Sequence, residues 1–208
     1  MNYDVIIVAS GKGERAHLGF NKVFYQMSDR LSVLDHSLNL FEQDEDCRSI
    51  IVVTNQEYFD QVKGSKVLLA EGGKERKDSV ANGLKYVKSE YVLIHDGARP
   101  FLHKESLEEL KKKVCECDAA ILGRMAFDTI KEVEEGKIKR TLDRNRIFLA
   151  ETPQAFRTEL IRDCFEHCED LAFTDDASLV ESLGHDVYVV IDRFDNRKLT
   201  KEEDFRDL

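Results

Sequence analysis

The stretch VIIVASGKGERAHLGFNK, residues 5–22, places a short apolar run directly before a glycine-rich, basic loop. Residues 5–9 are typical of a buried strand. After them, Gly11 and Gly13 let the backbone turn while its N–H groups stay unobstructed. Successive N–H groups of this kind form a concave site for anions. We therefore interpret this stretch as the first strand of an α/β fold, followed by a phosphate-binding loop.

The length of this loop distinguishes it from two other phosphate-binding loops. A dinucleotide-binding loop enters its helix at once and carries no cations, whereas this loop continues through Arg15 to Lys22 before any apolar helix begins. A Walker A loop requires G-x-x-x-x-G-K-[ST], a pattern that this loop does not follow. We interpret it as a solvent-facing loop that binds phosphate through its backbone, Lys12, Arg15 and Lys22. If the loop is considered without the rest of the sequence, the alternative is a solvated strand–helix connection whose basic residues have no functional role.

Composition limits the classes of partner. The chain has 208 residues and a net charge of −10, which allows one ample domain over residues 1–208. An acidic balance argues against binding nucleic acid or an anionic membrane. The sequence has no apolar run near the ~20 residues of a membrane span, and its N-terminus lacks the basic region of a signal peptide. We therefore expect a cytoplasmic protein.

Apolar periodicity beyond the first strand alternates between strand and helix patterns. Further strands are predicted at 50–53, 66–70, 91–94, 119–122 and 187–191. Helices are predicted around 34–41, 80–87, 107–114, 158–168 and 175–183, with a last one at 204–208. This order predicts a Rossmann-like α/β fold, a mainly parallel sheet with helices on both faces. Ligands of such sheets bind beyond the carboxyl ends of the strands.

Residues from about 127 to 148 depart from this alternation. Apolar and polar residues alternate on both sides of a turn at Glu135–Gly136, which is typical of a β-hairpin. Both sides are highly charged, so the hairpin cannot lie in a core. We predict a protruding β-hairpin arm that lies on the surface or packs on another chain. The two prolines, Pro100 and Pro153, are expected in rigid loops.

The five cysteines predict neither a disulfide framework nor a metal site. Cys164, His167 and Cys168 would share one helix face. A structural zinc site needs four ligands, however, and no fourth is evident. We predict that these residues serve packing and the surface.

The second glycine cluster is EGGKERKDSV, residues 71–80. Paired glycines at Gly72–Gly73 allow a flat ligand to approach the backbone closely. Ser79 would then lie in the first helical turn, where its hydroxyl can bond a base edge. The alternative for Asp78–Ser79 is an ordinary helix cap.

The third cluster is HDGARP, residues 95–100, at the end of a predicted strand. It sets the Asp96 carboxylate beside the Arg99 guanidinium, and a guanidinium can clamp phosphate with two hydrogen bonds. A structural ion pair is the alternative. Late loops add hydroxyls and charges suited to a polyol phosphate, although each could instead be a cap or a surface residue: Arg144, Thr152, Thr174, Asp195 and Lys198.

Taken in this order, the motifs resemble the 2-C-methyl-D-erythritol 4-phosphate cytidylyltransferase family of the non-mevalonate isoprenoid route. The motifs that carry the resemblance are Ala9–Arg15, Asn21–Lys22, Gly72–Val80, Asp96–Pro100, Leu142–Asn145, Thr152–Gln154, Thr174–Ser178 and Asp195–Thr200. They extend over essentially the whole chain. The sequence departs from the family pattern at Ser10 and Gly97, which replace alanines, at Ala16, which replaces methionine, and at Arg197, which replaces isoleucine.

The resemblance implies a nucleotidyltransferase that transfers CMP from CTP to 2-C-methyl-D-erythritol 4-phosphate and releases pyrophosphate. Arg15 and Lys22 would be catalytic. The nucleotide side would comprise Ala9, Ser10, Gly11, Gly13, Gly73, Lys74, Ser79, Asp96, Gly97, Ala98, Arg99 and Lys198. The polyol phosphate side would comprise Thr129, Arg144, Thr152, Thr174 and Asp195. Mg²⁺ or another divalent cation would be bound mainly through the CTP phosphates. The arm would form a homodimer, with Thr129 and Arg144 reaching the partner's site.

Three other functions fit parts of the sequence. A ribitol-5-phosphate cytidylyltransferase would share the loop and the fold, but residues 174–178 and 195–198 match the methylerythritol enzyme better. A nucleotide-binding module without catalysis is disfavoured by the intact Arg15 and Lys22. An NAD-dependent oxidoreductase would place an acid for the ribose where Thr54–Asn55 stands.

Overall fold

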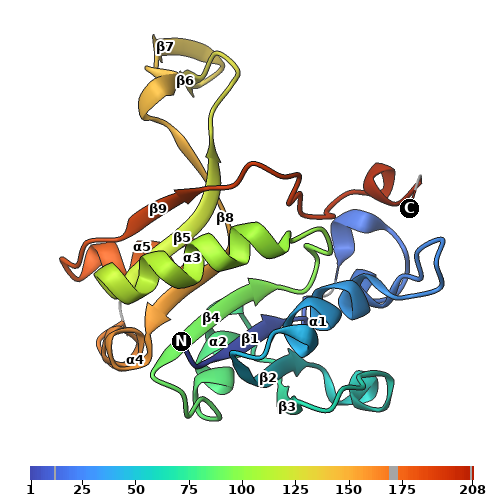
Figure 1. The fold of residues 1–208 in the computed structure, drawn as a ribbon. Helices are drawn as coiled ribbons and strands as arrows, with labels where there is room; N and C mark the ends of the chain where they lie inside the picture. The colour runs from blue at the N-terminus through green and yellow to red at the C-terminus, as the bar shows by residue number, and fades with distance from the viewer. Residues whose placement is uncertain (12, 169–172, 207) are drawn as a thin grey trace.

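The computed structural model describes residues 1–11, 13–168, 173–206 and 208, built around one seven-stranded sheet (Figure 1). The strand order is β3-β2-β1-β4-β8-β5-β9. The strands are β1 Tyr3–Val8, β2 Cys47–Thr54, β3 Val67–Glu71, β4 Tyr91–Asp96, β5 Ala119–Met125, β8 Phe148–Arg157 and β9 Tyr188–Ile191. Neighbouring strands pair in parallel except at β8, which runs antiparallel to both β4 and β5. The predicted mainly parallel sheet is therefore confirmed.

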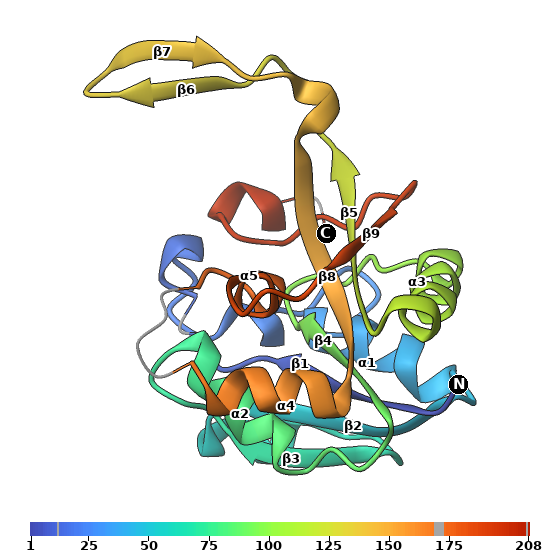
Figure 2. The ribbon, with the colours of Figure 1, turned by 90° about the vertical axis from the view of Figure 1, so that its left-hand side faces the viewer.

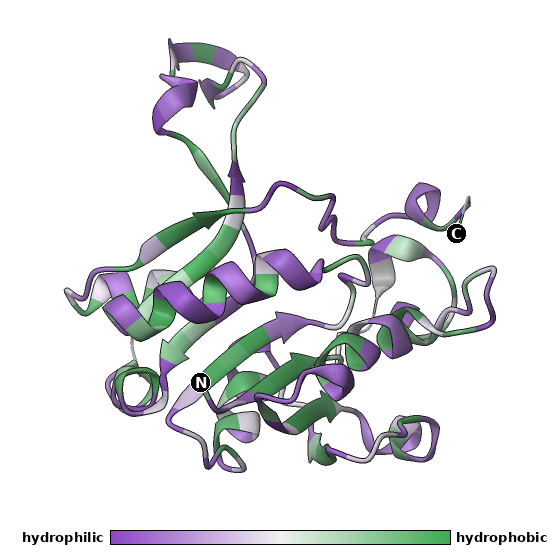
Figure 3. Cartoon of the chain, in the orientation of Figure 1, coloured by the Kyte–Doolittle hydropathy of each residue, from purple (hydrophilic) through white to green (hydrophobic). Residues whose placement is uncertain are grey.

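Helices cover both faces of this sheet, as predicted (Figures 1 and 2). One face packs on α1 Val33–Gln43 and α3 Lys104–Cys117, and the other on α2 Arg76–Leu84, α4 Thr158–Glu166 and α5 Asp176–Ser182. Side chains alternate along β1, so that Val5 and Ile7 join the first core and Ile6 joins the second. Figure 3 shows the resulting division, with hydrophobic strands inside and a hydrophilic outer side of α3.

Short 3-10 helices complete the chain: η1 Glu14–Ala16, η2 Lys22–Phe24, η3 Gln56–Gln61, η4 Arg144–Arg146 and η5 Glu202–Phe205. The prediction of a helix at 204–208 is wrong, because the helical turn begins earlier and ends at Phe205. Phe205 and Leu199 pack against Ala16 and Val33, which fixes the C-terminal segment beside the glycine-rich loop. Residue 207 lies outside the described part of the chain.

Strand β8 is the element that sequence patterns do not indicate. Its central residues, Glu151 to Gln154, are polar or proline yet buried between two neighbouring strands. The prediction that Pro153 lies in a loop is wrong. Pro153 lies inside β8, where the register to β5 shifts between Ile121 and Gly123. A proline is tolerated at such a bulge because the ladder is interrupted there.

The predicted arm is confirmed as a separate two-stranded sheet, β6 Lys131–Glu134 and β7 Lys137–Thr141. Glu135 and Gly136 both have positive φ, as a two-residue hairpin turn requires. β5 and β8 lead into the hairpin, which projects well away from the body of the chain (Figures 1 and 2). Its side chains are exposed on both strands.

Of the predicted packing residues, Cys164 is buried in the second core, whereas His167 is exposed. Among the residues described, His, Cys, Asp and Glu form no group of three or more that could hold a metal ion. The helices of the described ranges also include none with the length and apolarity to cross a lipid bilayer.

Candidate active site

A cleft of about 980 Å³ opens at the carboxyl ends of β1, β2, β3 and β4. Its lining includes residues at or just after the ends of those strands, as expected for a parallel sheet. The predicted residues that line it are Ala9, Ser10, Gly11, Gly13, Arg15, Lys22, Gly73, Lys74, Asp96, Ala98 and Lys198. The structure thus brings together residues of five motifs, which extend from Ala9 to Lys198 in the sequence.

The glycine-rich loop is anchored at its start. The Ala9 N–H donates to the Val53 carbonyl at 2.8 Å, and the Ala9 carbonyl accepts from Asn21 Nδ2 at 2.6 Å. Gly13 has a φ of +66°, a conformation that favours glycine. A Cβ there would also lie 3.3 Å from the Lys22 backbone nitrogen. Lys12, the other predicted loop cation, lies outside the described residues.

The two predicted catalytic cations differ in their surroundings. Arg15 is exposed, as predicted, but the prediction of a solvent-facing position is wrong for Lys22. Lys22 is buried at the start of η2, where its Nζ donates to the Leu199 carbonyl at 2.6 Å. Burial, with the nearby charges of Lys198 and Arg15, lowers its pKa to about 8. Lys22 is therefore mostly a cation at neutral pH, and one that a bound anion would stabilise.

Asp96 is the centre of a charged cluster. Its Oδ2 lies 2.7 Å from Lys198 Nζ and 3.7 Å from Arg99 Nε, and its Oδ1 lies 3.6 Å from Arg76 Nε. Burial alone would raise the pKa of this carboxyl, but Lys198 and then Arg76 and Arg99 hold it well below its usual range. Asp96 is therefore ionised, and the cations around it outnumber it.

Arg76 is a cleft residue that sequence reasoning missed. It lines the cleft at the start of α2 and bridges two carboxylates, Asp96 and the buried Asp176 at the start of α5. Burial and Arg76 act in opposite directions on Asp176, and burial prevails, so the pKa of Asp176 is raised. Arg76 lies within the Gly72–Val80 motif, and its place after the paired glycines at the first residue of a helix was the available signal.

The wall opposite the loop is built from the paired glycines. The Gly73 N–H donates to Ser79 Oγ at 3.0 Å, and that hydroxyl is also 3.2 Å from the Glu75 carbonyl. Ser79 is buried and does not line the cleft, so its hydroxyl shapes the turn while Gly73 and Lys74 face the ligand space. The helix cap is Glu75, not Asp78–Ser79, and Asp78 accepts from the Glu75 N–H.

Ser10, a departure from the family pattern, has a structural explanation. Its Oγ lies 2.9 Å from Ser79 Oγ, which joins the glycine-rich loop to the opposite wall. A Cβ on Gly72 would lie only 2.4 Å from the Ser10 Cβ, so these two segments of the chain approach closely at this point. Ser10 and Gly72 therefore lie where the glycine-rich loop and the opposite wall are in contact.

The turn after β4 carries the remaining residues of the nucleotide side. The Arg99 N–H donates to the Asp96 carbonyl at 3.0 Å, and the Gly97 N–H donates to the Val8 carbonyl at 3.0 Å. Arg99 lies behind the lining, where its Nη1 donates to the Asn196 carbonyl at 2.6 Å. The alternative prediction for this cluster was a structural Asp–Arg ion pair. Asp96 and Arg99 are indeed close, and their backbone hydrogen bond closes the turn.

The residues predicted for the polyol side are dispersed in a single chain. Thr152 is buried behind Asp96, and Thr174 and Asp195 lie at exposed loops outside the cleft lining. The α5 cap is Asp175, beside Thr174. Thr129 and Arg144 lie at the base of the arm, where Arg144 donates to the Phe127 carbonyl at 2.7 Å. The chain's own fold brings neither of them to its cleft.

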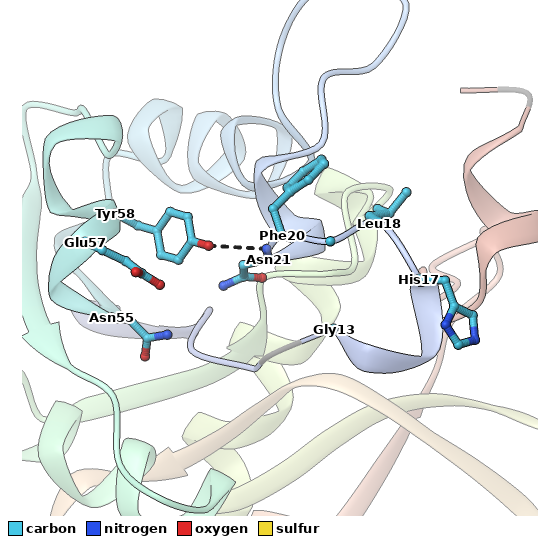
Figure 4. A pocket seen from close by; sticks show the side chains of 9 residues that line it. Gly13, His17, Leu18, Phe20, Asn21, Asn55, Glu57 and Tyr58 are labelled. Atoms are coloured by element: carbon cyan, nitrogen blue, oxygen red, sulfur yellow. Dashed lines mark hydrogen bonds between the residues drawn. The ribbon is translucent and has the colours of Figure 1, made fainter.

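A second hollow of about 560 Å³ lies on the outer side of the loop (Figure 4). It shares Gly13, Asn21 and Asn55 with the main cleft. Tyr58 lies across it, accepting from the Asn21 N–H at 3.4 Å and stacking on Phe24 at 4.5 Å. The aromatic pair supports Asn21, whose side chain in turn holds Ala9.

Known proteins match this chain over nearly its whole length. The family model IspD, described as 2-C-methyl-D-erythritol 4-phosphate cytidylyltransferase, matches residues 3–207. The proteins of that name from Bacillus licheniformis and Geobacillus thermodenitrificans are 39% and 40% identical, each over 98% of this chain and over 93% and 94% of their own length. The crystal structures of that enzyme from Francisella tularensis and Thermus thermophilus both have TM-scores of 0.84 at 29% identity. They cover 99% of this chain, and 97% and 96% of theirs.

Proposed function

Because the chain belongs to the 2-C-methyl-D-erythritol 4-phosphate cytidylyltransferase family, we propose that it transfers CMP from CTP to 2-C-methyl-D-erythritol 4-phosphate and releases pyrophosphate. The observation that carries this proposal is the cationic cleft of an otherwise acidic chain. Lys22, Arg15, Arg76 and Lys198 line it together with a glycine-rich loop. Such a lining suits two polyanions that must meet at close range.

The reaction needs charge stabilisation more than it needs a base. A phosphate monoester has a second pKa near ~6, so at neutral pH the attacking oxygen is mostly ionised. It attacks the α-phosphorus of CTP, forms a new P–O bond, and pyrophosphate leaves with the electron pair of the broken bond. Arg15 and Lys22 would cover the charge on the transferring group and the leaving group.

The two walls of the cleft divide the remaining roles. The backbone from Ala9 to Gly13 would hold the triphosphate, and Gly73 and Lys74 would contact the cytosine. Lys198 lines the cleft 2.7 Å from the Asp96 carboxylate and would contact the nucleotide and the second substrate. Thr174 and Asp195 would contact the polyol from loops at the rim.

A divalent cation would accompany the nucleotide. Asp96 and Glu75 are acidic residues that line the cleft, and Lys198, Arg76 and Arg99 already surround Asp96. This set suits Mg²⁺ held by the phosphate oxygens better than Mg²⁺ held by protein ligands. Bound through the triphosphate, Mg²⁺ would neutralise phosphate charge and favour departure of pyrophosphate.

The arm would complete the site of a second subunit. Phe127, Val133 and Ile138 are 87%, 57% and 64% exposed there, which is unusual for apolar side chains of a charged hairpin. Thr129 and Arg144 sit beside Phe127, at the base of the same arm. A cytoplasmic homodimer in which each arm supplies Arg144 to its partner accounts for these positions.

Substrate choice is the direct test of this function. The purified chain is incubated with CTP and Mg²⁺, with either 2-C-methyl-D-erythritol 4-phosphate or ribitol 5-phosphate, and pyrophosphate release is measured. We expect release with the first polyol phosphate and little with the second. Faster release with ribitol 5-phosphate would reassign the substrate, and CTP binding without release from either would indicate a non-catalytic module.

The pH dependence of turnover tests the role of Lys22. Because its pKa is lowered to about 8 in the free protein, raising the pH through 8 removes the charge that must face the triphosphate. We expect kcat/KM for CTP to fall above that pH, with a limiting slope of about tenfold per pH unit. The melting temperature, measured over the same range, separates this loss from unfolding. A level profile from pH 7 to 10 would exclude Lys22 as a required cation.

A further inference from the structure

A buried imidazole lies directly beneath the charged cluster of the cleft. His95 is fully buried at the end of β4 and packs edge-on against Phe41, with ring centroids 5.6 Å apart. Its Nε2 lies 3.2 Å from the Arg99 carbonyl, and its Nδ1 lies 3.1 Å from Thr152 Oγ1. The same Thr152 oxygen accepts from the Asp96 N–H at 3.0 Å.

The direction of each of these hydrogen bonds is determined. A carbonyl oxygen only accepts, so His95 Nε2 must carry the proton that it shares with Arg99. Burial lowers the pKa of His95 to about 4, so the ring is neutral near pH 7 and Nδ1 is an acceptor. The Thr152 hydroxyl must then donate to Nδ1, which leaves its lone pair for the Asp96 N–H.

One side chain therefore holds both ends of the turn that carries Asp96 and Arg99. At the end of the turn, His95 binds the Arg99 carbonyl directly. At its start, His95 binds the Asp96 N–H through the Thr152 hydroxyl. The turn is closed between these two points by the Arg99 N–H and the Asp96 carbonyl.

We propose that His95 is a positioning residue which, through Thr152, sets the place of Asp96 and Arg99 for CMP transfer. This inference rests on the proposed function. His95 itself cannot touch a substrate because it is fully buried. The Asp96 carboxylate organises Lys198, Arg76 and Arg99, so a shift of its backbone would displace several cations at once.

The test compares His95→Phe, Thr152→Val and the double variant. His95→Phe keeps an aromatic ring but breaks both bonds, and Thr152→Val keeps the shape of the side chain but loses the hydroxyl. Each is expected to lower kcat/KM by about 10- to 100-fold through misplacement of the charged groups. Both substitutions break the same chain of hydrogen bonds. The kcat/KM of the double variant should therefore be at most about threefold below that of the less active single variant.

A matched control separates positioning from loss of packing. Phe41→Leu disturbs the same part of the core without touching the chain of bonds. It should lower the melting temperature but keep kcat/KM within about twofold of the wild type. Wild-type kcat/KM in His95→Phe, multiplied losses in the double variant, or an equal loss in Phe41→Leu would each overturn the proposal.

The tautomer of His95 tests the hydrogen-bond geometry separately from the enzymatic function. The nitrogen chemical shifts of the His95 imidazole, measured by NMR on the wild-type protein, should show the neutral Nε2–H tautomer alone. The Nδ1–H tautomer would overturn the chain of bonds whatever the activity. If the tautomer is as expected but the wild-type protein releases no pyrophosphate, the proposed function fails while the geometry stands.

Discussion

Replacement of Lys22 by methionine is expected to lower kcat by about 10³-fold or more, because a single cation on the transferring group can contribute that much. Methionine keeps the apolar stem in its buried position. The fold should survive, since burial and two neighbouring cations already disfavour the charged form of Lys22. We expect an unchanged or higher melting temperature.

Arg15→Ala should lose activity on the same scale for a different reason. Arg15 is exposed on η1, so its removal leaves the core untouched. Lys63→Met is the matched control, because Lys63 is an exposed lysine outside the cleft lining. Pyrophosphate release at saturating substrate and a thermal melt are measured for each variant. Near-normal kcat in either Lys22→Met or Arg15→Ala would refute the assigned roles.

Mixing two inactive variants should restore activity if the arm completes the partner's site. Arg144→Ala is expected to be nearly inactive alone, as is Lys22→Met. In a mixed dimer, one site would carry both changes and the other neither. After free exchange of subunits, about a quarter of the wild-type activity should return, since half of the dimers are mixed and each has one intact site.

A second mixture provides the control for this experiment. Lys22 and Arg15 line the same cleft of one chain, so a mixed dimer of Lys22→Met and Arg15→Ala has one change in each site. That mixture should remain as inactive as its parents. If the Arg144→Ala mixture also stays inactive, Arg144 does not act across the subunit boundary.

Much of the fold was predictable because its signals are local. The strands at the core of the sheet and the helices between them carry unbroken apolar periodicity, and the hairpin turn needs only Glu135–Gly136. Strand β8 was not predictable in this way. Its polar centre and Pro153 contradict the local preferences of a strand, and only the bulge opposite β5 makes them compatible with a central position.

The candidate site likewise contains residues that local signals predict and residues that they do not. The glycine-rich loop, the paired glycines and Asp96 were predictable, because glycines and charged residues there follow the ends of predicted strands. Burial, however, depends on contacts distant in sequence, so no local pattern indicates that Lys22 is covered by the Leu199 segment. The role of Arg76 likewise depends on Asp176, which lies 100 residues away. The bonds of Thr152 are equally non-local.

Strand β8 restricts where insertions and deletions can occur in this chain. It leads from the arm into the sheet and carries Thr152 to the Asp96 N–H. A residue inserted or deleted between Phe148 and Thr152 would rotate every later side chain to the opposite face. It would also move Pro153 off its bulge. The strands on either side of Gly136 pair with each other, and a Cβ on Gly136 would meet no atom of the described residues within 4 Å. Insertions and deletions should therefore be tolerated at the tip of the arm and not along the strand that supports it.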